Sequence, residues 1–146
     1  MTSNPVSEEC VLCSAKSSPA DEKVYVLFRG SHCFVMLNLF PYNNGHLMIV
    51  PHDHVSTLNK LDEAALREVF ELASKCEKIL TKAYSPQGFN IGMNIGKCAG
   101  AGIQEHIHLH IIPRWHGDTN FMSVVAETRV IPEDIEATYK KLKPLF

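Results

Sequence analysis

The chain has 146 residues, of which 45% are hydrophobic and 21% charged, with a formal net charge of −2. This length and composition fit one domain with a proper core, so we expect a single domain over residues 1–146 whose first nine residues are flexible. The basic residues are spread out and no apolar run reaches membrane-spanning length, which argues against nucleic-acid and membrane partners and favours a cytoplasmic protein.

The first third of the chain predicts a loop followed by three strands. Residues 14–22 are small and polar, which is typical of a loop. Residues 24–29 and 32–38 flank the turn signal Gly30-Ser31 and predict a hairpin. Residues 46–50 are almost continuously apolar. That pattern indicates a central strand covered on both faces, which Pro51 closes.

The clearest helix spans residues 61–83, where apolar side chains recur at three- and four-residue steps. Asp62 and Glu63 suit its positive N-terminal end. Leu66, Phe70 and Leu80 widen the apolar stripe, so we expect one broad face to pack on a sheet.

Two further strands and a last helix follow. Residues 89–95 predict a fourth strand, with Ile91 and Ile95 on its apolar face. The last helix begins near Pro132 and has Ile135, Tyr139 and Leu142 as its apolar stripe. The expected fold class is therefore α+β.

Three histidines alternate with apolar residues in the segment that predicts the fifth strand. His106, His108 and His110 fall on one face, and Ile107, Leu109 and Ile111 fall on the other. Because an imidazole titrates near neutrality, one of these rings could act as a nucleophile or transfer protons. Several of them could instead bind a metal ion. The alternative without a function is a polar strand face in contact with solvent. Gly96, Gly100 and Gly102 precede the row, and such a loop can place backbone N–H groups around an anion. A phosphate beside a histidine row indicates phosphoryl or nucleotidyl transfer.

The cysteines indicate one metal or redox motif. Their number, five, is odd. Cys33 and Cys76 lie in apolar stretches as buried thiols, and we interpret Cys98 in the glycine loop as inert. Cys10 and Cys13 form a Cys-x-x-Cys pair, and because no buried strand precedes it, zinc is favoured over redox use. Two cysteines supply half of a tetrahedral site, so two ligands must come from elsewhere.

Two motifs together resemble the histidine triad (HIT) family. They are His-x-His-x-His-x-x at residues 106–112 and Gly-His-x-x-x-x-Pro at residues 45–51. Residues 38–43, 88–94 and 113–122 are further similar to its bacterial diadenosine tetraphosphate phosphorylase branch. The resemblance implies a HIT-like fold, with an antiparallel sheet of about five strands, one long helix and a C-terminal helix, and a homodimer.

The resemblance also implies an activity. Relatives cleave dinucleoside polyphosphates or related nucleoside 5′-phosphate derivatives through a covalent nucleotidyl-histidine. His108 matches the nucleophile, and His110 matches a phosphate-binding histidine whose cationic form offsets negative charge. His46 completes the polar row from a neighbouring strand, and Asn94 matches a contact to the phosphate or leaving group.

The same resemblance implies the substrate contacts. Asn38 matches a ribose contact, and Trp115 is carried over as substrate-binding. Leu37 and Phe40 are candidate walls of the base pocket, with plain core as the alternative. Backbone N–H donors are expected from Gly100, Ala101 and Gly102.

Relatives that contain zinc also provide a ligand set. It corresponds here to Cys10, Cys13, His54 and His106, a structural Zn²⁺ site closed to substrate; His52 in place of His54, or free thiols, are alternatives. We expect no organic cofactor.

Several alternatives stay open at this point. The chain has Gly102-Ile103 where many hydrolytic relatives have Gln-Ser or Gln-Thr, so a hydroxyl donor to the leaving group is absent. Water or phosphate can be the acceptor, and residues 115–122 favour phosphate. Other hypotheses for the function are a nucleoside phosphoramidase, a zinc-stabilised nucleotide-binding module with little turnover, and metal catalysis by the three histidines.

Overall fold

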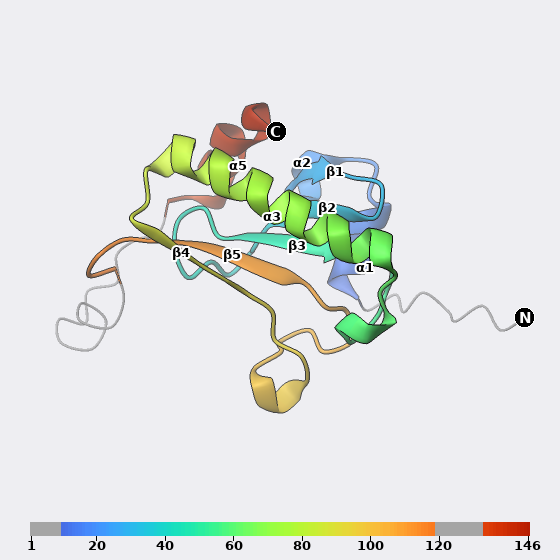
Figure 1. The fold of residues 1–146 in the computed structure, drawn as a ribbon. Helices are drawn as coiled ribbons and strands as arrows, with labels where there is room; N and C mark the ends of the chain where they lie inside the picture. The colour runs from blue at the N-terminus through green and yellow to red at the C-terminus, as the bar shows by residue number, and fades with distance from the viewer. Residues whose placement is uncertain (1–9, 119–132) are drawn as a thin grey trace, which may run out of the picture.

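The computed structural model describes residues 10–118 and 133–146. They form a five-stranded antiparallel sheet in the order β1-β2-β3-β5-β4, with the long helix α3 across one face (Figure 1). The strands are β1 (Val26–Arg29), β2 (Cys33–Leu37), β3 (Leu47–Pro51), β4 (Gly88–Gly92) and β5 (Leu109–Arg114). The α-helices are α1 (Val11–Ser17), α2 (Asp21–Val24), α3 (Glu63–Tyr84) and α5 (Ile135–Leu142), and the short 3-10 turns are η1 (Leu58–Lys60), η2 (Lys97–Ala99) and η3 (Lys143–Leu145). This architecture confirms the predicted α+β fold with its long helix and C-terminal helix.

The long helix starts and ends close to the predicted residues. Asp62 caps it by accepting a hydrogen bond from the Ala65 amide at 2.8 Å. The helix ends at Ser85, whose φ of 47° is left-handed. Phe70, expected on the sheet-packing face, is instead 65% exposed, because the sheet contacts the side of α3 that carries Val69, Leu72 and Cys76.

The two central strands are buried on both faces, as the continuous apolar run at residues 46–50 predicts. On one face, Val35, Leu37 and Ile49 belong to the main core under α3. On the other face, Phe34, Met36, Met48 and Val50 form a second core with residues of α1. Because side chains alternate along a strand, the two cores share β2 and β3.

The N-terminal loop prediction is wrong. Residues 14–22 contain most of α1 and the start of α2, and β1 begins at Val26 rather than at residue 24. The small, polar composition hides α1, because this helix of 7 residues lacks a side-chain cap at Cys10 and is stabilised by burying Leu12, Cys13 and Ala15. The first nine residues, Pro132 and the end of the 113–122 segment lie outside the described residues.

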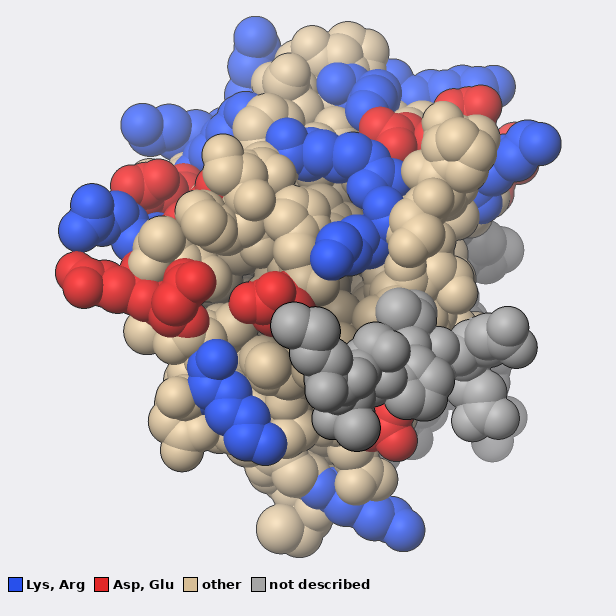
Figure 2. Space-filling view, turned by 90° about the vertical axis from the view of Figure 1, so that its right-hand side faces the viewer, with Lys and Arg blue, Asp and Glu red and all other residues tan. Residues whose placement is uncertain are grey.

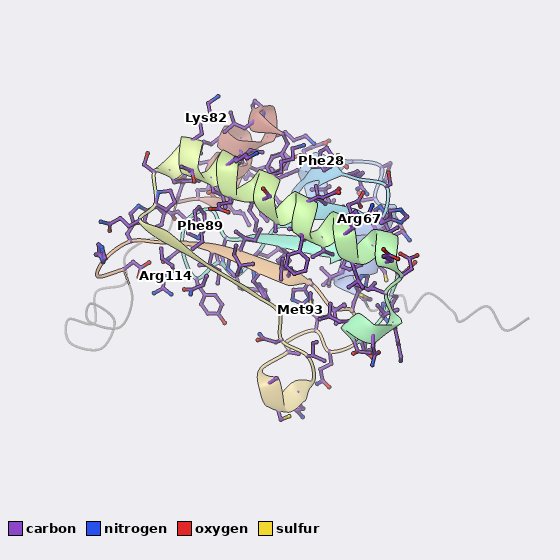
Figure 3. The ribbon with its side chains drawn as sticks, in the orientation of Figure 1. Phe28, Arg67, Lys82, Phe89, Met93 and Arg114 are labelled. Carbon is purple, nitrogen blue, oxygen red and sulfur yellow. The ribbon has the colours of Figure 1, made fainter. Side chains whose placement is uncertain are left out.

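The fourth and fifth strands are displaced from their predicted positions. β4 ends at Gly92, and Met93, labelled in Figure 3, lies just beyond it. β5 begins at Leu109, so His106 and His108 precede the regular strand. The Ile107 amide donates to the Val55 carbonyl, in the loop after β3, at 2.8 Å. This hydrogen bond ties residue 107 to that loop rather than to a neighbouring strand. Ile91, on the edge strand β4, is 45% exposed, and Ile95, in the segment after β4, is 40% exposed.

The C-terminal helix packs as predicted. Tyr139 and Leu142 are buried, Ile135 packs against the main core, and the Tyr139 hydroxyl donates to the Val26 carbonyl at 3.0 Å. Within residues 10–118 and 133–146, every helix is too short or too polar to cross a bilayer. Figure 2 views the end of the molecule where α1 and the start of α3 lie, and both signs of charge are interspersed there.

Candidate active site

Three histidine rings lie in contact at the centre of the sheet. The ring centroids of His108 and His110 are 4.7 Å apart, and those of His110 and His46 are 5.0 Å apart. His46 directly precedes β3, and β3 pairs with β5 so that Met48 faces His110. The register therefore brings residues 46 and 110 together although 64 positions separate them.

The proton on His108 is fixed by its neighbour. His108 Nδ1 lies 3.0 Å from the His106 carbonyl oxygen, and a carbonyl only accepts, so Nδ1 carries the proton. Nε2 then holds a lone pair, and His108 lines the main cavity. Burial lowers the pKa of His108, which keeps the ring neutral near pH 7. A neutral ring with a lone pair on its outer nitrogen is the nucleophilic form of histidine.

A second chain of hydrogen bonds orients His110. The Tyr42 amide donates to His46 Nδ1 at 3.2 Å, so the His46 proton lies on Nε2. His46 Nε2 is 2.9 Å from His110 Nδ1, which accepts, and the His110 proton therefore lies on Nε2. Asn38 Nδ2 is 3.3 Å from His46 Nε2, a longer contact that does not decide the tautomer. His110 can thus donate from Nε2 to a bound oxygen.

Burial keeps these rings neutral in the free protein. Burial, and then the neighbouring His110 and His108, together lower the pKa of His46 to about 3. Burial and then His108 lower the pKa of His110 to about 4. The expectation of a cationic His110 therefore does not hold for the free protein, although a bound phosphate would raise this pKa.

These pKa values predict acid lability. Below pH 6.5, His46 and His110 bind protons in the unfolded chain but stay neutral in the folded protein. The free energy of unfolding should therefore fall by up to about 1.4 kcal/mol per pH unit per ring between pH 6.5 and 4. Urea unfolding at pH 7, 6 and 5 measures this slope. His46→Gln should make the slope shallower, and His32→Gln, at an exposed position, should not. A His46→Gln slope equal to that of the wild type would contradict the assignment.

The histidines open into a cavity of about 710 Å³, which is a size typical of small-molecule sites. Apolar side chains from several elements line it, including Leu12, Ala15, Met36 and Met48, for which the sequence predicts no role in the site. Ile103, next to Gly102, also lines it. Alternation along β2 gives the signal that was missed, because Met36 and Asn38 share a face.

Most of the predicted site residues lie at this cavity. Asn38, Phe40, Asn94, Gly100, Gly102, His108 and His110 line it. Phe40 is 87% exposed, so the plain-core alternative does not apply to it. His46 is buried behind His110 and reaches the cavity through that ring.

Two residues predicted to bind substrate lie elsewhere. Leu37 is 1% exposed and belongs to the main core on the α3 side, because it alternates with Met36 and Asn38. Trp115 packs edge-to-face against Tyr84, with ring centroids 6.5 Å apart, outside the residues that line the cavity. We therefore leave Leu37 and Trp115 out of the proposed site.

The glycine loop uses two of its expected anion donors internally. The Gly100 amide donates to the Lys97 carbonyl at 3.0 Å, and the Ala101 amide donates to the Gly96 carbonyl at 3.3 Å. Asn94 Nδ2 donates to the Gly100 carbonyl at 3.5 Å, which holds the loop beside the cavity. Gly100 has a φ of 91°, which explains why a glycine is needed there. The expectation that the Gly100 and Ala101 amides face an anion therefore does not hold in the free protein.

Four further side chains converge beside the histidine row. The ligand atoms of Cys10, Cys13, His54 and His106 all lie within 4.8 Å of one another. The Cys13 Sγ atom is 3.2 Å from His54 Nδ1 and 3.5 Å from His106 Nδ1, and Cys10 Sγ is 3.6 Å from His106 Nδ1. Zn–S and Zn–N bonds of about 2.3 and 2.1 Å at tetrahedral angles separate S and N by about 3.6 Å, so this group fits zinc.

The contacts of the Nε2 atoms of His106 and His54 also suit a metal bound at the Nδ1 atoms. His106 Nε2 donates to the Pro51 carbonyl at 2.7 Å, which leaves a lone pair on Nδ1 facing the cysteines. His54 Nε2 lies 3.8 Å from a Glu105 carboxylate oxygen. His52 lies outside this group of converging ligand atoms, and its Nε2 donates to the Gly30 carbonyl at 2.9 Å, so His54 and not His52 is the fourth member.

Comparisons with known proteins agree with this architecture. A family model described as "HIT domain" matches residues 20–117. An "AP-4-A phosphorylase" of Mycobacterium tuberculosis is 39% identical over 123 residues, 84% of this chain and 63% of that protein. A "Bis(5'-nucleosyl)-tetraphosphatase [asymmetrical]" of Schizosaccharomyces pombe is 33% identical over 128 residues, 88% of this chain and 65% of that protein. The chain thus spans less than two thirds of the length of either relative.

Solved structures show the same fold. A Zn-bound histidine triad family protein from Mycobacterium smegmatis has a TM-score of 0.71 at 21% identity, covering 94% of this chain and 92% of that one. A hypothetical histidine triad nucleotide-binding protein from Sulfolobus tokodaii has a TM-score of 0.71 at 25% identity, covering 93% and 88%. Because the family model matches well over half of the chain and the fold agrees, this protein belongs to the histidine triad (HIT) family.

Proposed function

We propose that this protein is an enzyme that cleaves dinucleoside polyphosphates, such as diadenosine tetraphosphate, through a nucleotidyl-His108 intermediate. The observation that carries the proposal is the neutral His108 ring, which presents the Nε2 lone pair to a cavity of nucleotide size. The names of the two curated relatives support this substrate class.

The first step is a displacement at phosphorus. His108 Nε2 attacks the α-phosphorus, an N–P bond forms, and the P–O bond to the polyphosphate leaving group breaks. His110 Nε2–H donates to a non-bridging oxygen and stabilises the charge that develops there. The His106 carbonyl accepts from Nδ1–H and stabilises the ring as it becomes cationic.

The second step restores the histidine. An oxygen of phosphate, or of a water molecule that loses a proton to solvent, attacks phosphorus from the cavity. The N–P bond breaks, and its electron pair returns to His108 Nε2. We expect Asn38, which lies beside His46, to contact the ribose, and Met36, Met48 and Leu12 to provide an apolar wall for the base. A nucleoside phosphoramidase would share both steps and differ in its leaving group.

The products identify the acceptor. With diadenosine tetraphosphate and inorganic phosphate, we expect ADP and ATP, because the M. tuberculosis relative carries a phosphorylase name. Separation of the nucleotides by ion-exchange chromatography, at several phosphate concentrations, gives the ratio of ADP to AMP. AMP plus ATP at every phosphate level would rule out phosphorolysis, and intact substrate in all conditions would overturn the proposed function.

We also propose that Cys10, Cys13, His54 and His106 hold a structural Zn²⁺ ion. The ion would supply a fixed cross-link between the N-terminal helix and the active-site segment rather than a reaction step. The donor set and its S–N separations support this.

A homodimer is the proposed assembly. Leu66 of α3 and Met93 after β4 pack against the same small core, which places one side of α3 beside the end of β4. Phe70 lies one helical turn beyond Leu66 and is 65% exposed, and Ile91 on the edge strand is 45% exposed. An apolar surface on an open sheet edge suits a second copy of the chain.

The dimer is tested by its mass. Sedimentation equilibrium should give about twice the 16.3 kDa of one chain, and Ile91→Asp should yield the monomer. Phe40→Ser removes an aromatic ring that is 87% exposed, outside this surface, and should leave the mass unchanged. A monomeric wild type at micromolar concentration would contradict this assembly.

A further inference from the structure

Helix α1 belongs at once to the Cys/His group and to the cavity. Cys10 and Cys13, at its start, face the group with His54 and His106. Val11, Leu12, Ser14 and Ala15, from the same two turns, line the cavity that also contains His108. Any displacement of the two cysteines therefore moves a cavity wall.

The two ends of α1 are held differently. At the C-terminal end, the Arg29 guanidinium donates to the carbonyls of Ala15 at 2.9 Å and Lys16 at 2.8 Å. At the N-terminal end, Cys10 provides no side-chain cap. A helix of 7 residues is unstable in isolation, so its first turn depends on what the two cysteines bind and on burial of Leu12.

His106 provides a second link to the site. Its Nδ1 atom lies 3.5 and 3.6 Å from the two cysteine sulfurs, and its carbonyl accepts from His108 Nδ1 at 3.0 Å. One residue thus contacts both the Cys/His group and the nucleophile.

We propose that metal occupancy of Cys10, Cys13, His54 and His106 sets the nucleotide affinity of the cavity, and that bound nucleotide in turn retains the metal. With the metal bound, α1 is fixed as the apolar wall that Leu12 and Ala15 provide. Without it, the first turn of α1 is released and the wall loses its fixed position, so a nucleotide must order that turn when it binds. This inference rests on the proposed function, because it takes the cavity as the nucleotide site.

The test measures binding rather than turnover, with AMP as the probe. Calorimetry compares the AMP Kd of zinc-loaded and chelator-treated protein, and we expect binding to weaken by about 5–150-fold on metal removal. Because coupling is reciprocal, saturating AMP should tighten zinc binding by the same factor. Equal AMP Kd values for the two forms would overturn this inference alone. AMP binding to neither form would instead overturn the proposed function, and this inference with it.

A kinetic measurement covers the case in which the stripped protein unfolds. Transfer of zinc from the loaded protein to a chromogenic chelator should be slower with AMP present, and a rate independent of AMP would overturn the inference. Leu12→Ala keeps all four ligands but removes the buried contact, so it should bind one zinc, bind AMP more weakly and show a smaller AMP effect on zinc release. Cys98→Ser, which alters an exposed cysteine outside the group, should behave as the wild type.

Discussion

Replacing His108 with glycine or alanine should lower kcat by roughly 10⁴–10⁶-fold and leave AMP affinity nearly unchanged. In the proposed mechanism, the ring supplies the lone pair that attacks phosphorus, whereas Asn38 and the apolar residues that line the cavity contact the nucleoside. Steady-state kinetics with diadenosine tetraphosphate and calorimetry with AMP separate the two effects.

The matched control is His116→Ala. His116 is exposed on the turn after β5, so its replacement should leave kcat unchanged. Activity of the His108 variants equal to that of the wild type would refute covalent catalysis. This result would favour a different nucleophile, whereas absence of turnover in the wild type itself would favour the zinc-stabilised binding module.

Removal of the proposed zinc ion should lower the thermal stability of the protein by a large amount. Free zinc at about 1,000 times its Kd stabilises a folded protein by about 4 kcal/mol. For a chain of 146 residues this corresponds to a fall in Tm of roughly 8–16 °C on chelation. Cys13→Ser should reproduce the fall, because it removes the sulfur that lies near both histidine ligands.

Differential scanning calorimetry with and without a chelator makes this measurement, and Cys98→Ser is the matched cysteine control. Immediate, reversible loss of activity at an unchanged Tm would point to a catalytic ion instead. An unchanged Tm and unchanged activity would contradict zinc binding at this group.

The elements with strong local signals could be predicted from the sequence. The helix predicted at residues 61–83 is observed at Glu63–Tyr84, because a long apolar period and the Asp62 cap act in the same direction. The doubly buried β3 follows from its continuous apolar run. α1 escaped prediction because its stability comes from tertiary burial of Leu12 and Ala15 rather than from its own composition.

The sequence likewise predicts some features of the candidate site and not others. The row of His106, His108 and His110 is visible as alternation, but the tautomers depend on the His106 carbonyl and the Tyr42 amide, which no spacing reveals. The ligand group joins Cys10 and Cys13 to residues that lie far along the chain, so family resemblance rather than spacing indicated it. The use of the Gly100 and Ala101 amides inside the loop depends on a short turn at η2 that a glycine count does not specify.

The most direct measurement is mass spectrometry of the protein quenched during turnover of diadenosine tetraphosphate. Because N–P bonds of phosphohistidine type hydrolyse in acid, the quench and digestion should be alkaline. We expect an added AMP group on the peptide that contains His108, and its absence from the His108→Gly variant. An adduct on another residue, or none while substrate is being consumed, would show that His108 is not the nucleophile.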